Sequence, residues 1–255
     1  MRRPDKFIGL PRQGWQSGAD HRGLTACIFD VDGVLLASPH ERAWREALET
    51  RAEQERFTTA FYQAHVAGRP RLSGALAALE ALDTPNAAQR APAYAERKQQ
   101  RLEELIAAGD VVAFPDALRF VQAVRMLGWP MAVASSSKNA SAMLQQVRLD
   151  TGGSLLELFS ANVCGRDLPR GKPDPAVFLL AAAELAVPAA CCLVVEDAVA
   201  GIEAARAGDM TALGVARLHD AALLQAAGAS LVVTSLDAIA LHELAQGRLM
   251  SSVGA

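Results

Sequence analysis

Short apolar runs alternate with helical segments through the C-terminal part of the chain. The runs are bounded by polar or turn residues, and this pattern is typical of buried strands in a parallel sheet. Strands are predicted over residues 131–134, 159–163, 191–195, 211–215 and 231–233, with helices over 115–127, 140–147, 176–185 and 200–207 between them. Strands alternating with helices predict right-handed crossovers and an α/β fold, a parallel sheet with helices on both faces.

A further apolar run, Ala26–Phe29, comes earlier and predicts the first strand. No strand is predicted between Gly33 and Gly109, where the apolar residues recur at helical spacing. Thr84 and Pro85 there resemble a helix N-cap followed by a first-turn proline. A stretch this long exceeds an ordinary loop, so we expect a small all-helical domain inserted after the first strand. The expected division is a loose N-terminal tail (1–23), a core (24–36 and 111–255) and a helical cap (37–110).

Composition narrows the class of protein. The 255 residues carry a net charge of -3, without the basic excess typical of nucleic-acid binding. No apolar run reaches the ~18 residues that a membrane span needs, and the N-terminus lacks the apolar segment of a signal peptide. The four cysteines form no Cys-x-x-Cys pair, which favours reduced packing residues and a cytoplasmic location. We therefore expect no membrane and no nucleic-acid partner.

Two carboxylates, Asp30 and Asp32, follow the first predicted strand directly. The carboxyl ends of parallel strands form the crevice in which open α/β sheets bind ligands. Residues two apart in extended backbone can face the same way, and two such charges repel unless a cation lies near them. A strand ending in a polar turn is the ordinary alternative, but the pair also suits a divalent metal.

Three more polar segments follow predicted strands or their loops, around Ser135, Lys172 and Glu196-Asp197. A serine run after a strand is also typical of a helix N-cap. Together, however, the segments have the chemistry of phosphoryl transfer, which needs a cation, hydrogen-bond donors and an in-line nucleophile. Mg²⁺ prefers oxygen ligands, and a carboxylate can be phosphorylated as a nucleophile.

The residues suggest a role for each group. Asp30 is the expected nucleophile, and it forms the expected Mg²⁺ site with Glu196 and Asp197. Asp32 is placed to protonate the leaving oxygen and later to deprotonate the attacking hydroxyl. Ser135 would offer hydrogen bonds to phosphate, and Lys172 would neutralise the nucleophile and phosphate.

Four ordered motifs carry a resemblance to the haloacid dehalogenase-like hydrolase superfamily. They are Phe29-Asp30-Val31-Asp32-Gly33-Val34-Leu35, Ser135, Gly171-Lys172-Pro173-Asp174-Pro175 and Val195-Glu196-Asp197-Ala198-x-x-Gly201-Ile202-x-Ala204. The resemblance implies a Rossmann-like core, a helical cap, Mg²⁺ and an aspartyl phosphate on Asp30. It also implies that the carbonyl of Asp32 joins the metal ligands.

Within that superfamily the chain is similar to the β-phosphoglucomutase-like group. His40-x-x-Ala43-Trp44 resembles its hinge-proximal cap helix. Arg71 and Lys98 occupy cap positions where that group places the Arg that binds the distal phosphate and a Lys, although solvated surface charge is the ordinary alternative for both. The tract 133–139 resembles its phosphate-binding loop, which adds four more candidate substrate contacts: Ser136, Ser137, Lys138 and Asn139. The chain departs from the group between Gly33 and His40, where the segment leading into the cap is shorter.

The leading hypothesis is a Mg²⁺-dependent phosphatase acting on a small phosphosugar. A phosphomutase such as β-phosphoglucomutase would use the same site. A metal-free 2-haloacid dehalogenase and a non-enzymatic phospho-acceptor module are further alternatives. The dehalogenase has no need of the acidic pair, and the acceptor module needs neither a cap nor a leaving-group acid.

Overall fold

The computed structural model describes residues 23–37, 39–150 and 152–252. The expected N-terminal tail lies outside these residues except for Gly23. The elements that form the main sheet and flank it are, in chain order, β1 (Ala26–Phe29), α6 (Pro115–Met126), β4 (Met131–Val133), α7 (Ala140–Gln146), β5 (Ala161–Asn162), α8 (Ala176–Glu184), β6 (Cys192–Glu196), α9 (Val199–Ala207), β7 (Thr211–Val215), α10 (Ala221–Ala226), β8 (Leu231–Val233) and α11 (Leu241–Leu244).

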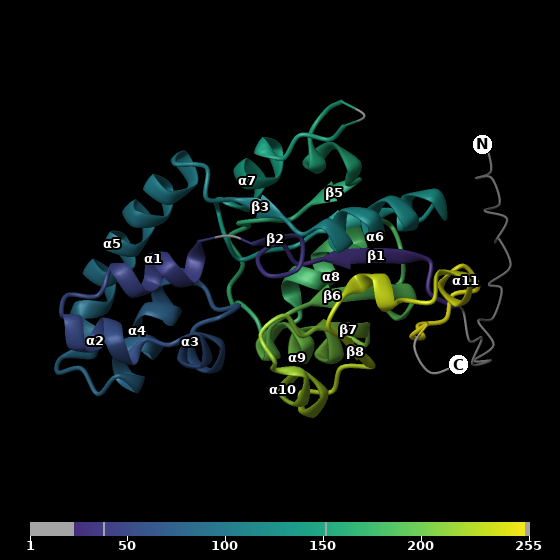
Figure 1. The fold of residues 1–255 in the computed structure, drawn as a ribbon. Coiled ribbons are helices and arrows are strands. Elements are labelled where there is room, and N and C mark those ends of the chain that lie inside the picture. Colours follow the sequence, from purple (N-terminus) through teal and green to yellow (C-terminus); the bar gives the residue numbers. More distant parts are fainter. Residues whose placement is uncertain (1–22, 38, 151, 253–255) are drawn as a thin grey trace, which may run out of the picture.

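All pairings in the six-stranded sheet are parallel, and the strand order is β5-β4-β1-β6-β7-β8. The strand and helix alternation predicted from the sequence is therefore confirmed (Figure 1). The first strand, β1, lies between β4 and β6, so the residues that follow it emerge at the middle of the sheet edge. Short 3₁₀ turns complete this part of the chain: Leu155–Leu158, Ala189–Cys191 and Leu236–Ala238.

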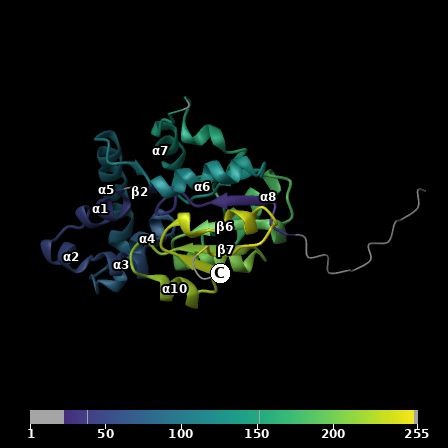
Figure 2. The same ribbon diagram turned by 45° about the vertical axis from the view of Figure 1, so that its right-hand side comes forward.

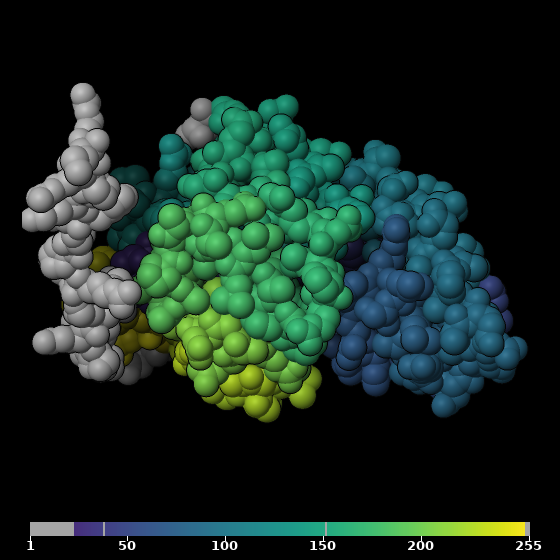
Figure 3. Space-filling view, turned by 180° about the vertical axis from the view of Figure 1, so that it is seen from behind, coloured from purple at the N-terminus to yellow at the C-terminus, as the bar shows by residue number. Residues whose placement is uncertain are grey.

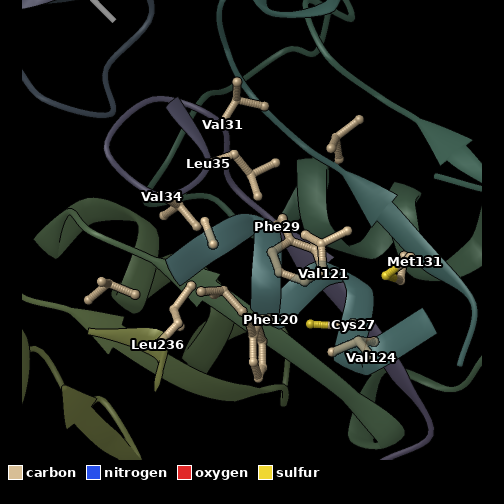
Figure 4. Close-up of a cluster of buried hydrophobic side chains, with 14 of the residues drawn as sticks. Cys27, Phe29, Val31, Val34, Leu35, Phe120, Val121, Val124, Met131 and Leu236 are labelled. Atoms are coloured by element: carbon tan, nitrogen blue, oxygen red, sulfur yellow. The ribbon is translucent and has the colours of Figure 1, made fainter. Parts of the chain in front are cut away.

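Side chains of β1 alternate between two hydrophobic clusters, one on each face of the sheet. Cys27 and Phe29 pack with α6 and α7, whereas Ala26 and Ile28 pack with α8, α9 and α10. Figure 4 shows α6 side chains turned toward β1, and the Phe29 and Phe120 rings meet edge to face with centroids 6.0 Å apart. Burial on both faces explains why the strands are continuous apolar runs rather than alternating ones.

A helical lobe, His40–Ala107, follows β1 and comprises five helices: α1 (His40–Glu46), α2 (Arg51–Arg56), α3 (Thr59–His65), α4 (Arg71–Ala81) and α5 (Ala87–Ala107). It has its own core, in which the rings of Trp44 and Tyr94 pack edge to face at 5.3 Å. The lobe lies at one end of the sheet in Figures 1 and 2, and Figure 3 shows it in contact with the core from behind. That the two parts are separate domains divided at 36/37 and 110/111 stays a prediction.

Two short strands connect the lobe to the core, β2 (Leu36–Ala37) and β3 (Val112–Ala113), and they pair antiparallel. The prediction of no strand between Gly33 and Gly109 is therefore wrong at β2. Two residues are too few for a detectable sequence period, and the pairing partner lies far along the chain.

The expected N-cap at Thr84 is also wrong, because helix α5 begins at Ala87 after an N-cap Asn86 in the left-handed conformation. Thr84 is buried, and its hydroxyl donates to Glu53 Oε1 at 3.3 Å. The Thr84 side chain therefore makes a long-range hydrogen bond to Glu53 instead of capping the helix.

None of the helices in the described residues is both long and apolar enough to cross a bilayer. Cys27, Cys164, Cys191 and Cys192 are all free thiols. The cytoplasmic location stays a prediction.

Candidate active site

The residues that follow four strands converge on one cavity of about 340 Å³ between the core and the helical lobe. Its wall contains every site residue predicted from the sequence except Asn139: Asp30, Asp32, His40, Trp44, Arg71, Lys98, Ser135, Ser136, Ser137, Lys138, Lys172, Glu196 and Asp197. Asn139 accepts a hydrogen bond from Gln99 at 3.3 Å and does not line the cavity. Asn139 is the N-cap residue of α7, one residue beyond the segment that lines the cavity, and its contact with substrate stays a prediction.

Lys172 is the central cation of the cavity floor. Its ammonium lies 2.5 Å from Asp30 Oδ1 and 2.5 Å from Glu196 Oε1, and its side chain is 1% exposed. It also lies 4.8 Å from the centre of the Phe178 ring. A lone lysine beside a proline is usually solvated, but the fold buries this one between two carboxylates. Burial lowers the pKa of Lys172, but Asp30 and Glu196 outweigh that effect and hold the pKa above its ordinary value.

Glu196 is held by the turn that follows β6. Its Oε2 accepts hydrogen bonds from the backbone N–H groups of Asp197 and Ala198, at 2.9 and 3.0 Å. A Cβ on Gly201 would lie 1.9 Å from the Glu196 carboxyl carbon, so only glycine lets this carboxylate rest against α9. This contact explains the glycine of the fourth motif.

Three carboxylates, from Asp30, Glu196 and Asp197, bring oxygen atoms within 4.8 Å of one another. Burial raises the pKa of Asp30 to about 7, although Lys172 opposes the shift. Burial and the neighbouring Glu196 also raise the pKa of Asp197. One ammonium does not balance the charge of three adjacent carboxylates, so this cluster of hard oxygen donors fits a divalent cation such as Mg²⁺.

Asp32 lies two residues after Asp30, on the turn that leads out of β1. The N–H of Gly33 donates to the carbonyl of Leu36 at 2.8 Å. The carbonyl of Asp32 belongs to the same trans peptide, so it points the opposite way, away from Leu36. Gly33 has a φ of +86°, a conformation that favours glycine.

The phosphate-binding candidates form the turn after β4. The Ser135 hydroxyl accepts from the N–H of Ser137 at 3.1 Å, and Ser135 is buried. Lys138 is at the rim, where it pairs with Asp167 at 3.0 Å. A tight turn at the end of β4 thus places Ser135, Ser136 and Ser137 in the wall of the cavity.

The helical lobe contributes a cluster around His40. Its Nδ1 lies 3.1 Å from Lys98 Nζ, and its Nε2 lies 3.6 Å from Asp32 Oδ1. An ammonium can only donate, so Nδ1 accepts and the ring proton resides on Nε2, facing Asp32. Burial lowers the pKa of His40 to about 4 and that of Lys98 to about 8. Lys98 also lies 5.0 Å from the centre of the Trp44 ring, so its ammonium contacts both His40 and Trp44.

Sequence reasoning missed two residues near the site. Tyr62 of α3 lines both this cavity and a smaller one of about 180 Å³, and burial and the charges of Asp32 and Asp197 raise the pKa of its hydroxyl. Arg217 also lines the smaller cavity. No motif in the sequence around Tyr62 indicates that it lies at the site. Arg217 follows β7, so it could have been found by searching the residues after every predicted strand for polar side chains.

Comparisons with known proteins agree with this geometry. A family described as haloacid dehalogenase-like hydrolase matches residues 24–209. A β-phosphoglucomutase of Mycobacterium bovis is 33% identical over 91% of this chain and 93% of its own length. A phosphorylated carbohydrates phosphatase of Thermotoga maritima is 31% identical over 82% of this chain and 94% of its own. The crystal structure of a β-phosphoglucomutase from Pyrococcus sp. strain ST 04 has a TM-score of 0.66 and 29% identity, and covers 87% of this chain and 97% of that one.

Proposed function

Because the chain belongs to the haloacid dehalogenase-like hydrolases, as a phosphatase or phosphomutase, we propose that it is a Mg²⁺-dependent phosphatase of small phosphosugars. The observation that carries this proposal is the meeting of Asp30, Glu196, Asp197 and Lys172 in the wall of one cavity. Both phosphatases and phosphomutases of sugars are among the similar proteins, which supports the substrate class.

The side chains of Asp30, Glu196 and Asp197, with the carbonyl of Asp32, would hold the Mg²⁺ ion. When bound, the ion would neutralise the carboxylates and the phosphate so that the two anions can approach. Glu196 differs from the other two, because Lys172 and two backbone N–H groups already occupy its oxygens. We therefore assign Glu196 a second role beside its place in the metal site, which is to hold Lys172 next to Asp30.

The chemistry of the chain's own residues follows from their positions. A carboxylate oxygen of Asp30 attacks phosphorus, and the bond between phosphorus and the sugar oxygen breaks. Asp32 gives its proton to that leaving oxygen. It then takes a proton from water, whose oxygen attacks phosphorus and breaks the bond to Asp30, releasing phosphate. Lys172 and the Ser135 turn supply charge and hydrogen bonds to the phosphoryl oxygens throughout.

A phosphomutase is the second candidate, and one observation favours it. Arg71 and Lys98 of the helical lobe line the same cavity as Asp30, and no ion pair of Arg71 occurs within the described part of the chain. A second phosphate on the sugar could bind there while the first is transferred. The dehalogenase and the phospho-acceptor module are weaker candidates, because neither uses Asp32 together with the Glu196 and Asp197 carboxylates.

A panel of phosphosugars assayed for phosphate release tests the proposal. Turnover that requires Mg²⁺, stops with EDTA and is abolished in Asp30→Ala is expected. Formation of glucose 6-phosphate from β-glucose 1-phosphate with a glucose 1,6-bisphosphate primer would identify a mutase instead. Activity on a 2-haloacid in EDTA would establish the dehalogenase, and a stable phosphate on Asp30 without turnover would establish the acceptor module.

A further inference from the structure

Arg217, two residues after the end of β7, belongs to none of the four motifs. Its guanidinium donates to two consecutive backbone carbonyls, from Nε to Gly33 at 2.9 Å and from Nη2 to Val34 at 3.1 Å. The side chain is 15% exposed. Gly33 and Val34 directly follow Asp32, so an arginine from the far side of β6 holds the turn that carries the proposed acid/base.

Asp116 fixes the guanidinium from its other side. It accepts two parallel hydrogen bonds from Arg217, at 3.1 and 3.2 Å, and further ones from the N–H of Leu236 and the hydroxyl of Ser235. Burial opposes ionisation of Asp116, but Arg217 and the Leu236 N–H hold its pKa below the ordinary value. A bidentate, charged pair of this kind has little rotational freedom.

Phe114 completes the arrangement at the point where the chain returns from the helical lobe. The guanidinium carbon lies 3.8 Å from the centre of the Phe114 ring. The N–H of Phe114 donates to the carbonyl of Leu35 at 3.0 Å. Arg217 therefore contacts both crossings between the lobes, the outgoing one at Gly33 and Val34 and the returning one at Phe114.

The three peptide planes after Asp32 are each hydrogen-bonded. The first is fixed by the bond from the Gly33 N–H to Leu36, and the next two by Arg217. This fixing matters because the segment from Gly33 to His40 must place Asp32 at the cavity and also lead into α1. We propose that Arg217 is a positioning residue for Asp32, which holds the turn so that the Asp32 carboxyl faces the leaving oxygen. This inference rests on the proposed function, in which Asp32 is the acid/base.

The test uses a leaving-group comparison in the first turnover. A sugar phosphate leaves as a poor alkoxide and needs a proton from Asp32, whereas 2,4-dinitrophenyl phosphate leaves without one. Arg217→Met keeps the apolar stem over Phe114 and removes the donors. We expect it to slow phosphoryl transfer from the sugar phosphate about 100-fold, and from the dinitrophenyl ester less than about threefold. Asp32→Asn, which lacks the acid itself, should also slow the sugar phosphate far more than the dinitrophenyl ester. The ratio of the two effects in Asp32→Asn is the largest that Arg217→Met can reach.

Arg119→Met is the matched control. Arg119 lies on α6 and makes an equally bidentate pair with Asp237, at 2.9 and 2.6 Å, but its side chain is 60% exposed and both of these hydrogen bonds go to Asp237 rather than to the 33–36 turn. Both rates should stay as in the unaltered protein. Amide hydrogen exchange of residues 33–37 should be faster in Arg217→Met and unchanged in Arg119→Met. This measurement reports on the order of the turn independently of catalysis.

Equal slowing of both substrates, or no slowing of either, overturns the positioning role. Should Arg217→Met fail to fold, Arg217→Lys replaces it, because lysine keeps a cation that can reach one carbonyl. The positioning role is then supported if Arg217→Lys slows the sugar phosphate more than the dinitrophenyl ester. If the unaltered protein forms no phosphoenzyme, or Asp32→Asn turns over normally, the proposed function fails instead, and the two failures are thereby distinguished.

Discussion

The Cα of Gly33 lies directly against the carboxylate of Asp197. A Cβ placed on Gly33 would come 1.9 Å from Asp197 Oδ2, and the φ of Gly33 is +86°. The motif that carries the proposed nucleophile thus touches the motif that carries a proposed metal ligand, at a position where only glycine fits.

We expect Gly33→Ala to abolish phosphatase activity and to weaken Mg²⁺ binding, because the methyl group must displace Asp197. Calorimetric titration with Mg²⁺ and a phosphate-release assay measure the two effects. Gly109→Ala is the matched control, since Gly109 has the same φ of +86° but nothing within 4 Å of its Cβ. It should lose about 1 kcal/mol of stability from backbone strain alone and keep its Mg²⁺ affinity. Equal loss of Mg²⁺ affinity in both variants would contradict the contact with Asp197.

Replacing Lys172 should destabilise the metal-free protein. Lys172→Met leaves Asp30 and Glu196 buried without their counter-ion, a loss that typically costs about 3–5 kcal/mol of unfolding free energy. Urea denaturation in EDTA measures this cost, and Lys138→Met, at an exposed rim lysine, should cost little. Adding Mg²⁺ should recover more stability in Lys172→Met than in the unaltered protein. A Lys172→Met protein as stable as the unaltered one in EDTA would argue against the buried pairing.

A side chain at Gly171 should push the helical lobe away from the loop that carries Lys172. Its Cβ would lie 2.3 Å from Pro70 Cγ, and the stiff proline ring cannot turn aside. We expect Gly171→Ala to raise KM for the phosphosugar by about tenfold, because a displaced helical lobe would lose part of its contact with the substrate. X-ray scattering should show a larger radius of gyration.

Gly208→Ala provides the comparison for Gly171→Ala. Its Cβ would also meet a proline, Pro175, but at 3.3 Å and within the core. KM and the radius of gyration should stay unchanged. An unchanged radius in Gly171→Ala as well would mean that the lobes do not meet at Pro70 in solution.

Lys98 should make the stability of the metal-free protein depend on pH. Burial lowers its pKa from 10.5 to about 8, so between these values the unfolded chain binds more protons than the folded one. Stability therefore rises as the pH increases from about 8 to 10.5, and the cost of burying the charge is fully present below pH 8. Lys98→Met should be more stable at pH 7, by at most about 3 kcal/mol, and the advantage should vanish near pH 10.5. Denaturation curves across this range, with Lys138→Met as the exposed control, measure it; a constant difference between Lys98→Met and the unaltered protein would refute the buried charge.

Local sequence determined the six strands of the main sheet, the order of the helices between them and the position of the reactive groups at strand ends. The six strands of the sheet are predictable because burial on both faces requires continuous apolar runs, and Asp30, Ser135 and Glu196 are predictable because parallel strands end at one edge. The same information could not fix the start of α5, where Thr84 bonds to Glu53 rather than capping the helix.

Only the tertiary structure decided which of those groups meet. Sequence periods report the face on which a residue lies, not the partner that a long-range contact brings to it. Lys172 is buried because the fold closes the loop over Asp30, 142 positions away, and Arg217 reaches Gly33 because β7 lies two strands from β1. Contacts between residues so far apart in the sequence depend on how whole helices and strands pack. Local sequence therefore indicates which residues have the required chemistry, and the fold brings them together.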